Sequence, residues 1–180
     1  DQLLGGKCRE AAAVDTHANG YTPEEVADNV QQFMDQGYRY VRIQMGGYGG
    51  KSSTMVKPED APDGAYFDPR AYTRNMLRMM EHVRATVGEE VELLHDVHER
   101  LAPIDAVQFA KDVERFKLFF LEDLFAPEDI EWFQMTRDQC ATPLAMGELF
   151  AHPGESTPLI SRRLMYWQVY LHKTVIASEY

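Results

Sequence analysis

Cysteine is scarce in this chain of 180 residues, which has only Cys8 and Cys140, without CxxC spacing or neighbouring histidines. The sequence therefore indicates neither a zinc site nor a disulfide framework, and we expect buried free thiols. A cluster of Lys and Arg is also missing, and the net charge is −11. Because nucleic acids and anionic membranes are bound through concentrated positive charge, we expect neither as a partner. A small molecule is the expected partner.

Long hydrophobic runs are absent as well. No stretch approaches the roughly 20 apolar residues of a membrane span, and no charged-then-apolar leader stands at the start. We therefore expect a cytoplasmic protein. The hydrophobic content of 44% is enough for one substantial core, in one domain or part of one. Because the chain begins Asp-Gln-Leu-Leu without a methionine, we expect an N-terminal portion to be missing.

Runs typical of β-strands alternate with amphipathic stretches typical of helices along most of the chain. The predicted strands are residues 9–15, 38–44, 91–96, 118–122 and 143–148. The predicted helices are residues 22–36, 68–87, 103–116 and 127–139. This alternation indicates an α/β fold in which each helix carries the chain back to a parallel strand. The Met residues of the second helix are expected to pack in the core.

Three of the predicted strands end in an acidic residue, and these acids are Asp96, Glu122 and Glu148. They stand 26 residues apart both times, which suits one strand, one helix and two loops. They should therefore meet at the C-terminal ends of three successive parallel strands, where a (β/α) barrel has its active site. Converging carboxylates repel one another unless a cation neutralises them, and all-oxygen ligation favours Mg²⁺, with Mn²⁺ as a replacement.

A simpler interpretation exists for each acid alone. It would cap the next helix or bind a surface arginine at the end of its strand. Matching positions at equal spacing favour the shared metal site over three separate coincidences.

Two histidines surround the first of these acids. On an extended strand His98 would share a face with Asp96, while His95 would point the other way. An imidazole titrates near neutrality and can act as a general acid or base, so we predict this role for His98. The alternative is a packed side chain without chemistry.

The first two predicted strands offer polar groups at their ends. His17 and Asn19 follow the first strand, and Arg42 and Gln44 share one face of the second. Such groups suit the carboxylate and hydroxyls of a sugar acid. The alternative is a solvated strand end with a surface arginine. The neighbouring charges could support the key residues or lie on the surface; they are Glu99, Arg100 and Asp123.

The segments LLHDVHERLAPIDA, FFLEDLFAPED and TPLAMGELF resemble the enolase superfamily, and within it the mannonate dehydratase family, which includes gluconate dehydratases. Supporting matches are LLGGK, DTHANG and VRIQMGGYGG. The resemblance covers roughly residues 3–165 and implies part of a (β/α) barrel, with residues 1–165 as the barrel portion. Residues 166–180 depart from the family pattern and stay unassigned.

The resemblance also implies roles for individual residues. The Mg²⁺ ligands would be Asp96, Glu122 and Glu148. His98 would be the acid or base, His17 would contact substrate, and Arg42 would belong to the base on the opposite side. The implied reaction removes water from a sugar acid through an enediolate and gives a 2-keto-3-deoxy acid. The family tendency to self-associate makes a homo-oligomer the expected assembly.

The sequence departs from the family at the base. Family dehydratases pair the arginine with a tyrosine twelve residues later, and here that position is Thr54, so Tyr48 is the nearest candidate. We also expect five to six strand–helix units in this chain, without the capping domain and the last barrel strands of the family. Two alternatives follow, a catalytically silent homologue that binds a metal or metabolite in a regulatory role, and another Mg²⁺-dependent lyase or racemase.

Overall fold

The structure, a computed structural model, describes residues 13–46, 57–64, 66–152, 154, 157–158, 161–162 and 166–167. Its elements, in order, are β1 (Thr16–Gly20), α1 (Pro23–Asp35), β2 (Tyr40–Met45), α2 (Pro69–Val87), β3 (Glu92–Asp96), α3 (Pro103–Val113), the 3-10 turn η2 (Glu114–Phe116), β4 (Phe120–Glu122), α4 (Ile130–Gln139), β5 (Leu144–Met146) and β6 (Tyr166–Trp167). The sequence expectations for Cys8, Tyr48, Thr54 and residues 168–180 lie outside the described residues.

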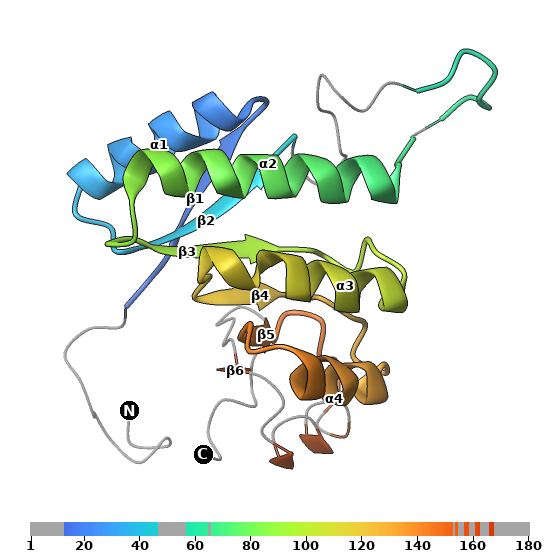
Figure 1. The fold of residues 1–180 in the computed structure, drawn as a ribbon. Helices are drawn as coiled ribbons and strands as arrows, with labels where there is room; N and C mark the ends of the chain where they lie inside the picture. Colours follow the sequence, from blue (N-terminus) through green and yellow to red (C-terminus); the bar gives the residue numbers. More distant parts are fainter. Residues whose placement is uncertain are drawn as a thin grey trace.

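In the described part of the chain, six strands form one parallel sheet whose spatial order is the same as their order in sequence. Helices α1 to α4 follow one another along one face of this sheet (Figure 1). Strands that wind in one direction, with helices on one face only, form the wall of a (β/α) barrel and not a doubly wound sheet. The predicted fold class is therefore confirmed.

The first strand lies later in the chain than the sequence predicted. Residues 13–15 are not in a strand, and β1 begins at Thr16, where it pairs with Val41 of β2. His17 and Asn19 are therefore part of β1 and do not follow it. The prediction favoured the apolar run before Asp15, but only Ala18 of β1 is buried, so hydrophobicity does not mark this strand.

Helices α1 and α2 begin where the sequence placed them because their caps are local, whereas α4 begins at Ile130, three residues later than predicted, and has no side-chain cap. Thr22 Oγ1 accepts a hydrogen bond from the Glu25 backbone N–H at 3.2 Å, and the Glu25 carboxylate accepts from the Tyr21 N–H at 2.7 Å. These two bonds resemble a capping box, with Glu25 bound to the residue before the N-cap, and they set the start of α1. Asp68 caps α2 by accepting from two backbone N–H groups, and α2 ends at Gly88, whose φ is 75°.

The sheet has two different faces. Toward the helices, strand residues such as Ile43 and Leu121 pack with Met76, Met79 and Met80 of α2, which confirms the predicted core role of these methionines. The opposite face carries a small apolar cluster, consisting of Leu94, Phe120 and Ala145 with Tyr40 packed against it. Arg42, Asp96 and Glu122 are two residues further along the same strands and on the same face. On this face, a layer of charged side chains therefore lies closer to the C-terminal ends of the strands than the small apolar cluster does.

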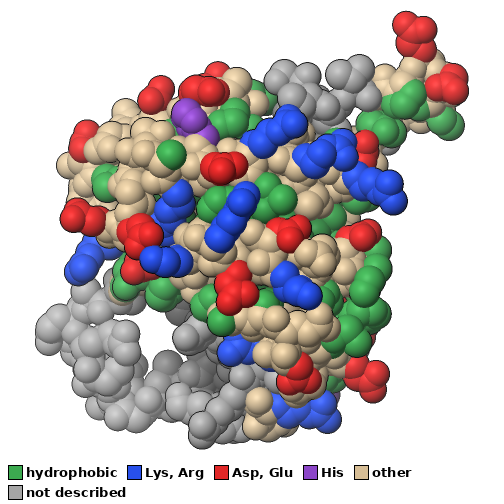
Figure 2. Space-filling model, in the orientation of Figure 1, with side chains coloured by type: hydrophobic (Ala, Val, Ile, Leu, Met, Phe, Trp, Pro, Cys, Tyr) green, Lys and Arg blue, Asp and Glu red, His purple; other side chains and the backbone are tan. Residues whose placement is uncertain are grey.

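On the surface shown in Figure 2, acidic and basic side chains are interspersed over the helices, and neither sign forms a continuous field. Among the described helices, none has the length and apolar character that crossing a membrane requires. Cys140 is a buried free thiol, as expected.

Candidate metal centre and active site

Asp96 and Glu122 lie side by side at the ends of β3 and β4. They are direct partners in the parallel pairing of the two strands, and they are 1% and 0% exposed. Two buried carboxylates at this separation repel each other unless positive charge lies beside them. The sequence prediction that these acids meet is therefore correct.

Arg42 of β2 supplies positive charge from one side. Its Nη1 donates to Asp96 Oδ2 at 3.0 Å and to Glu122 Oε2 at 3.1 Å. Its Nη2 lies 3.1 Å from His17 Nδ1, and because a guanidinium only donates, His17 accepts through Nδ1 and carries its proton on Nε2. Partial burial, and then the charge of Arg42, lower the pKa of His17. Arg42 therefore links β2 to β1, β3 and β4 at the C-terminal ends of the strands, which form the mouth of the barrel wall.

Glu148 also lies near this site, but it is in a turn and not at the end of a strand as predicted. Strand β5 ends at Met146 and its Ala145 is the partner of Glu122, so Glu148 lies in a turn beyond the sheet. The equal spacing in sequence thus does not give equal positions in the sheet, because the strand partner of Glu122 is Ala145, three residues before Glu148. Glu148 Oε1 nevertheless lies 3.5 Å from His98 Nδ1, so the third acid lies at the same end of the sheet as Asp96 and Glu122.

His98 also lies outside its strand. Strand β3 ends at Asp96, and His98 has a left-handed backbone with φ of 54°, so strand alternation does not place it. Two backbone bonds hold its turn against β4, from Val97 N–H to the Glu122 carbonyl and from Glu99 N–H to the Asp123 carbonyl, both 2.9 Å. His98 Nδ1 is 4.0 Å from Asp96 Oδ1. The predicted neighbourhood is correct, although the reason for it was wrong.

Asp123 belongs to the centre, although the sequence analysis named it only as a neighbouring charge that could support the key residues or lie on the surface. It is 0% exposed, and neither of its carboxylate oxygens has a hydrogen-bond partner within the part of the chain that the structure describes. Burial, and then the charges of Glu122 and Asp96, raise its pKa to about 9. The signal in the sequence was a second acid directly after the strand end. Strand alternation would turn it away from Glu122, but its φ is 44°.

The polar residues of β1 and β2 form a second row beside the acids. Asn19 is the partner of Gln44 in the strand pairing, next to the pair formed by His17 and Arg42. The side chain of Gln44 is buried, and its amide nitrogen and oxygen have no partner among the described residues. Asn19 is exposed, and its carbonyl accepts from Asn29 at 2.7 Å. The predicted site residues that the structure describes therefore lie at the same end of the parallel sheet.

These residues fit a divalent cation. Asp96, His98 and Asp123 each offer a ligand atom within 4.8 Å of the other two, and Glu122 and Glu148 flank them. Carboxylate oxygens are the ligands that Mg²⁺ and Mn²⁺ prefer. A cation at this centre would also give a partner to the buried oxygens of Asp123, which have none among the described residues.

A family model described as "Enolase C-terminal domain-like" matches residues 25–174. The chain belongs to this family. The predicted resemblance to the enolase superfamily is confirmed.

Relatives of this enolase-like chain are named as a sugar-acid dehydratase or as members of a dehydratase family. A D-galactonate dehydratase family member of Enterocloster bolteae is 47% identical over 165 residues, which cover 89% of this chain and 41% of the relative. A D-mannonate dehydratase of a Caulobacter species is 37% identical and is matched over 97% of this chain and 45% of its own length. The chain thus spans less than half the length of these curated relatives.

A solved structure is similar over the same region. The enolase from Pantoea ananatis, crystallised with bound D-gluconate and magnesium, has a TM-score of 0.85 and 43% identity to this chain. The match covers 93% of this chain and 45% of that one.

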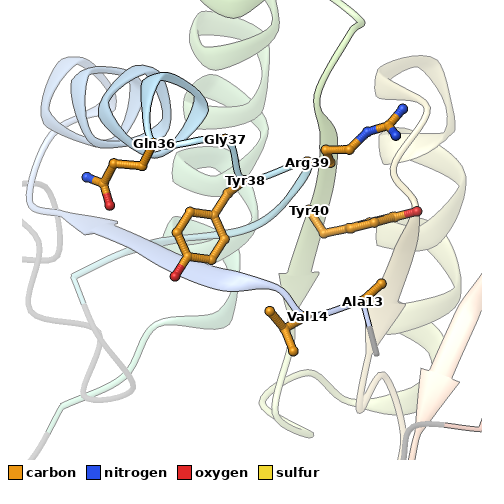
Figure 3. Close-up of a pocket in the computed structure, with 7 residues that line it drawn as sticks. All are labelled: Ala13, Val14, Gln36, Gly37, Tyr38, Arg39 and Tyr40. Carbon is orange, nitrogen blue, oxygen red and sulfur yellow. The ribbon is translucent and has the colours of Figure 1, made fainter. Parts of the chain in front are cut away.

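The enolase-like sheet also has a pocket of about 400 Å³ at its other end, where β2 begins. Its lining is formed by Ala13, Val14, Gln36, Gly37, Tyr38, Arg39 and Tyr40. The polar ends of Gln36 and Arg39 point in different directions, so no set of polar groups converges there (Figure 3). The chemistry-bearing groups lie instead at the C-terminal ends of the strands, as in other barrels of this type.

Proposed function

We propose that this protein is part of a sugar-acid dehydratase that uses Mg²⁺, with Mn²⁺ as a replacement. The observation that carries this proposal is the convergence of Asp96, Glu122, Glu148 and His98 at one end of the parallel sheet. The names of its relatives support the substrate class, which is an aldonic acid of the mannonate, galactonate or gluconate type. The proposed product is a 2-keto-3-deoxy acid.

The proposed ligands of the cation are Asp96, Glu122 and Glu148. When bound, the cation would supply positive charge that stabilises the carboxylate of the substrate as its α proton leaves. Arg42 holds the first two carboxylates in place through Asp96 Oδ2 and Glu122 Oε2. This arrangement orients the two ligands and reduces their mutual repulsion.

The other proposed roles follow from position. His98 lies on the Oδ1 side of Asp96 and would donate a proton to the departing hydroxyl. Arg42 lies on the Oδ2 side and would support the base, for which Tyr48 is the candidate in the sequence. His17, Asn19 and Gln44 would bind the carboxylate or hydroxyl groups of the substrate.

The reaction balances without an oxidant or reductant. The base removes the proton α to the carboxylate, a carbon–carbon double bond forms toward the β carbon, and the β carbon–oxygen bond breaks. The hydroxyl leaves as water with the proton from His98. The resulting enol takes up a proton on carbon and becomes the 2-keto acid.

A second candidate is a catalytically silent homologue that binds a metal or metabolite. Two observations favour it. Thr54 stands where dehydratases of the family have a tyrosine, and Arg42 already forms ion pairs with two of the three proposed ligands. This candidate predicts binding of Mg²⁺ without any turnover.

The test is incubation of the purified protein with Mg²⁺ and a library of aldonic acids, followed by detection of 2-keto-3-deoxy acids. We expect product from at least one acid, loss of product after chelation, and loss of product in Glu122→Gln. Asp28→Asn on the exposed face of α1 is the charge-matched control and should behave like the wild type. Cation binding without product across the library would support the silent homologue, and conversion without loss of water would support a racemase or another lyase.

A further inference from the structure

Gln44 carries a buried amide for which the described part of the chain provides no partner. This residue of β2 is 4% exposed, and neither its amide nitrogen nor its amide oxygen has a hydrogen-bond partner among the described residues. A buried amide without partners destabilises the folded state, because its hydration is lost and nothing replaces it. Such groups are rare in folded proteins and call for a partner from outside the chain, such as a ligand or a water.

The strand places this amide on the face of the mouth. Ile43, its neighbour in β2, packs in the core under the helices, so Gln44 points to the opposite face of the sheet. In the strand pairing, Arg42 is the partner of Leu94 of β3. Gln44 and Asp96 each stand two residues further along their strands, so the amide lies beside the first of the proposed magnesium ligands.

Asn19 provides a second amide next to the first. It is the partner of Gln44 in the pairing of β1 with β2, and adjacent strands are about 4.8 Å apart. Ala18 before it packs in the core, so Asn19 also faces the mouth, where it is exposed. The two amides therefore form a short row that runs from solvent at β1 to the buried position on β2.

The chemistry of an amide restricts what this row can bind. Gln44 offers a donor through Nε2 and an acceptor through Oε1. A carboxylate only accepts, so it would leave Oε1 without a donor, whereas a hydroxyl both donates and accepts and satisfies either atom. Two amides side by side therefore fit two neighbouring hydroxyl groups better than they fit a carboxylate.

The hydroxyl that leaves in the proposed reaction is not the partner of this row. Its proposed proton donor is His98, which follows β3 and lies 3.5 Å from Glu148, beyond β5. Gln44 is on β2, which lies on the other side of β3 in the sheet. The hydroxyls that remain for the two amides are those that take no part in the elimination.

We propose that Gln44 and Asn19 bind two neighbouring hydroxyl groups of the substrate beyond its β carbon, and thereby restrict the reaction to polyhydroxy acids. This inference rests on the proposed function and names the part of the acid that the mouth recognises. Gln44 determines the specificity, because an acid without these hydroxyls leaves the buried amide unpaired, whereas the exposed Asn19 stays hydrated.

The experiment compares six-carbon acids with a three-carbon acid. D-mannonate, D-galactonate and D-gluconate carry hydroxyls beyond the β carbon, whereas glycerate has the carboxylate, the α proton and the β hydroxyl but nothing beyond them. Binding of each acid in saturating Mg²⁺ is measured by calorimetry, and kcat/KM is measured from the 2-keto product. The proteins are the wild type, Gln44→Met, Asn19→Ala and, as the matched control on the exposed face of α1, Gln32→Met.

We expect the wild type to prefer the best six-carbon acid to glycerate by at least about 100-fold in kcat/KM. In Gln44→Met, affinity and kcat/KM for that six-carbon acid should fall about 10- to 100-fold, because its hydroxyls lose their partner. The values for glycerate should stay the same. Asn19→Ala should show a smaller loss with the same selectivity, and Gln32→Met should behave like the wild type.

The stability of Gln44→Met separates recognition of the substrate from a structural role. Methionine is close to glutamine in size and has no amide that needs a partner, so the variant should unfold at the same urea concentration as the wild type or at a higher one. An amide with a structural role would give the opposite result, which is lower stability together with equal losses for glycerate and the six-carbon acids. That result would overturn the proposal.

The outcomes also separate this proposal from the proposed function. If Gln44→Met binds and converts the six-carbon acids as the wild type does, water or another part of the protein satisfies the amide, and the dehydratase stands without this recognition. If the wild type forms no product but Gln44→Met still loses affinity for the six-carbon acids alone, the proposed reaction is wrong and the recognition of the hydroxyls stands.

Discussion

His95 and Asp123 are both fully buried titratable residues near the ends of neighbouring strands, but their surroundings differ. His95 faces the helices, where its Nδ1 bonds to the Ile43 carbonyl at 2.8 Å and its Nε2 to the Tyr72 hydroxyl at 2.9 Å. Because a carbonyl only accepts, the proton of neutral His95 is on Nδ1, and Tyr72 donates to Nε2. Asp123 faces the mouth and has no hydrogen-bond partner among the described residues.

This difference separates stability from function in the same sheet. The helix-facing side satisfies its polar groups and contributes to the folded state. The mouth keeps carboxylates close together at a cost in stability, which is typical of sites that await a ligand. Substitutions on the helix-facing side should therefore change the free energy of unfolding, whereas substitutions at the mouth should change cation binding and activity.

The largest effect is expected at the mouth. Replacing His98 with Gln removes the proposed proton donor, so kcat of the dehydration should fall by about 10²- to 10⁴-fold. The affinity for Mg²⁺ should change little, because His98 is not a proposed Mg²⁺ ligand. Steady-state kinetics and calorimetry measure the two quantities, with His82→Gln on α2 as the matched control. Full activity in His98→Gln would remove this residue from the mechanism.

The pH dependence of stability should show the cost of the buried acid. In metal-free protein, Asp123 keeps its proton up to a pKa of about 9, whereas in the unfolded chain it loses it near its usual value of about 3.9. The folded state then binds more protons across this range, so its contribution to stability falls as pH rises from about 4 to about 9. Urea unfolding at several pH values in EDTA should show this fall, and it should be smaller in Asp123→Asn.

The helix-facing side should respond in stability alone. Tyr72→Phe removes the donor to His95 Nε2 without leaving a large cavity, and we expect a loss of about 1–3 kcal/mol in the free energy of unfolding. Burial lowers the pKa of His95 to about 4, so the ring stays neutral and its nitrogen keeps a lone pair to be satisfied. Affinity for Mg²⁺ should be unchanged. A variant as stable as the wild type would mean that water or another group satisfies His95.

The smallest expected effect concerns the far end of the strands. Arg84 donates to four backbone carbonyls there, and they belong to Gly88, Val91, Phe116 and Lys117. Because this site is only half-buried, Arg84→Ala should cost about 1–2 kcal/mol, since water replaces part of the lost bonding. Arg78→Ala, an exposed arginine on the same helix, should change stability by at most about 0.5 kcal/mol. Equal effects of the two would show that the bonds of Arg84 contribute nothing.

The sequence predicted α1 and α2 best because their signals are local. Thr22 with Glu25, and Asp68 with Gly88, mark the ends of α1 and α2 without any tertiary information. The first strand was misplaced because β1 has one buried residue, and its position depends on pairing with β2. The hydrophobicity of a short segment does not show which distant segment it pairs with in the sheet.

The candidate site was predictable as a set of acids but not as a geometry. Asp96 and Glu122 end their strands as expected. His98 and Asp123 reach the site through backbones with positive φ, a conformation that non-glycine residues adopt only where the surrounding structure holds it. Strand alternation therefore gave the wrong reason for His98 and no role for Asp123.

The most direct test of this account is the calorimetric titration of metal-free protein with Mg²⁺, in parallel for the wild type, Glu122→Gln and Asp28→Asn. We predict one Mg²⁺ bound by the wild type and by Asp28→Asn, and an affinity at least about 100-fold weaker in Glu122→Gln. Equal binding by all three proteins would mean that the buried acids at the strand ends are not a cation site, and would contradict the central claim.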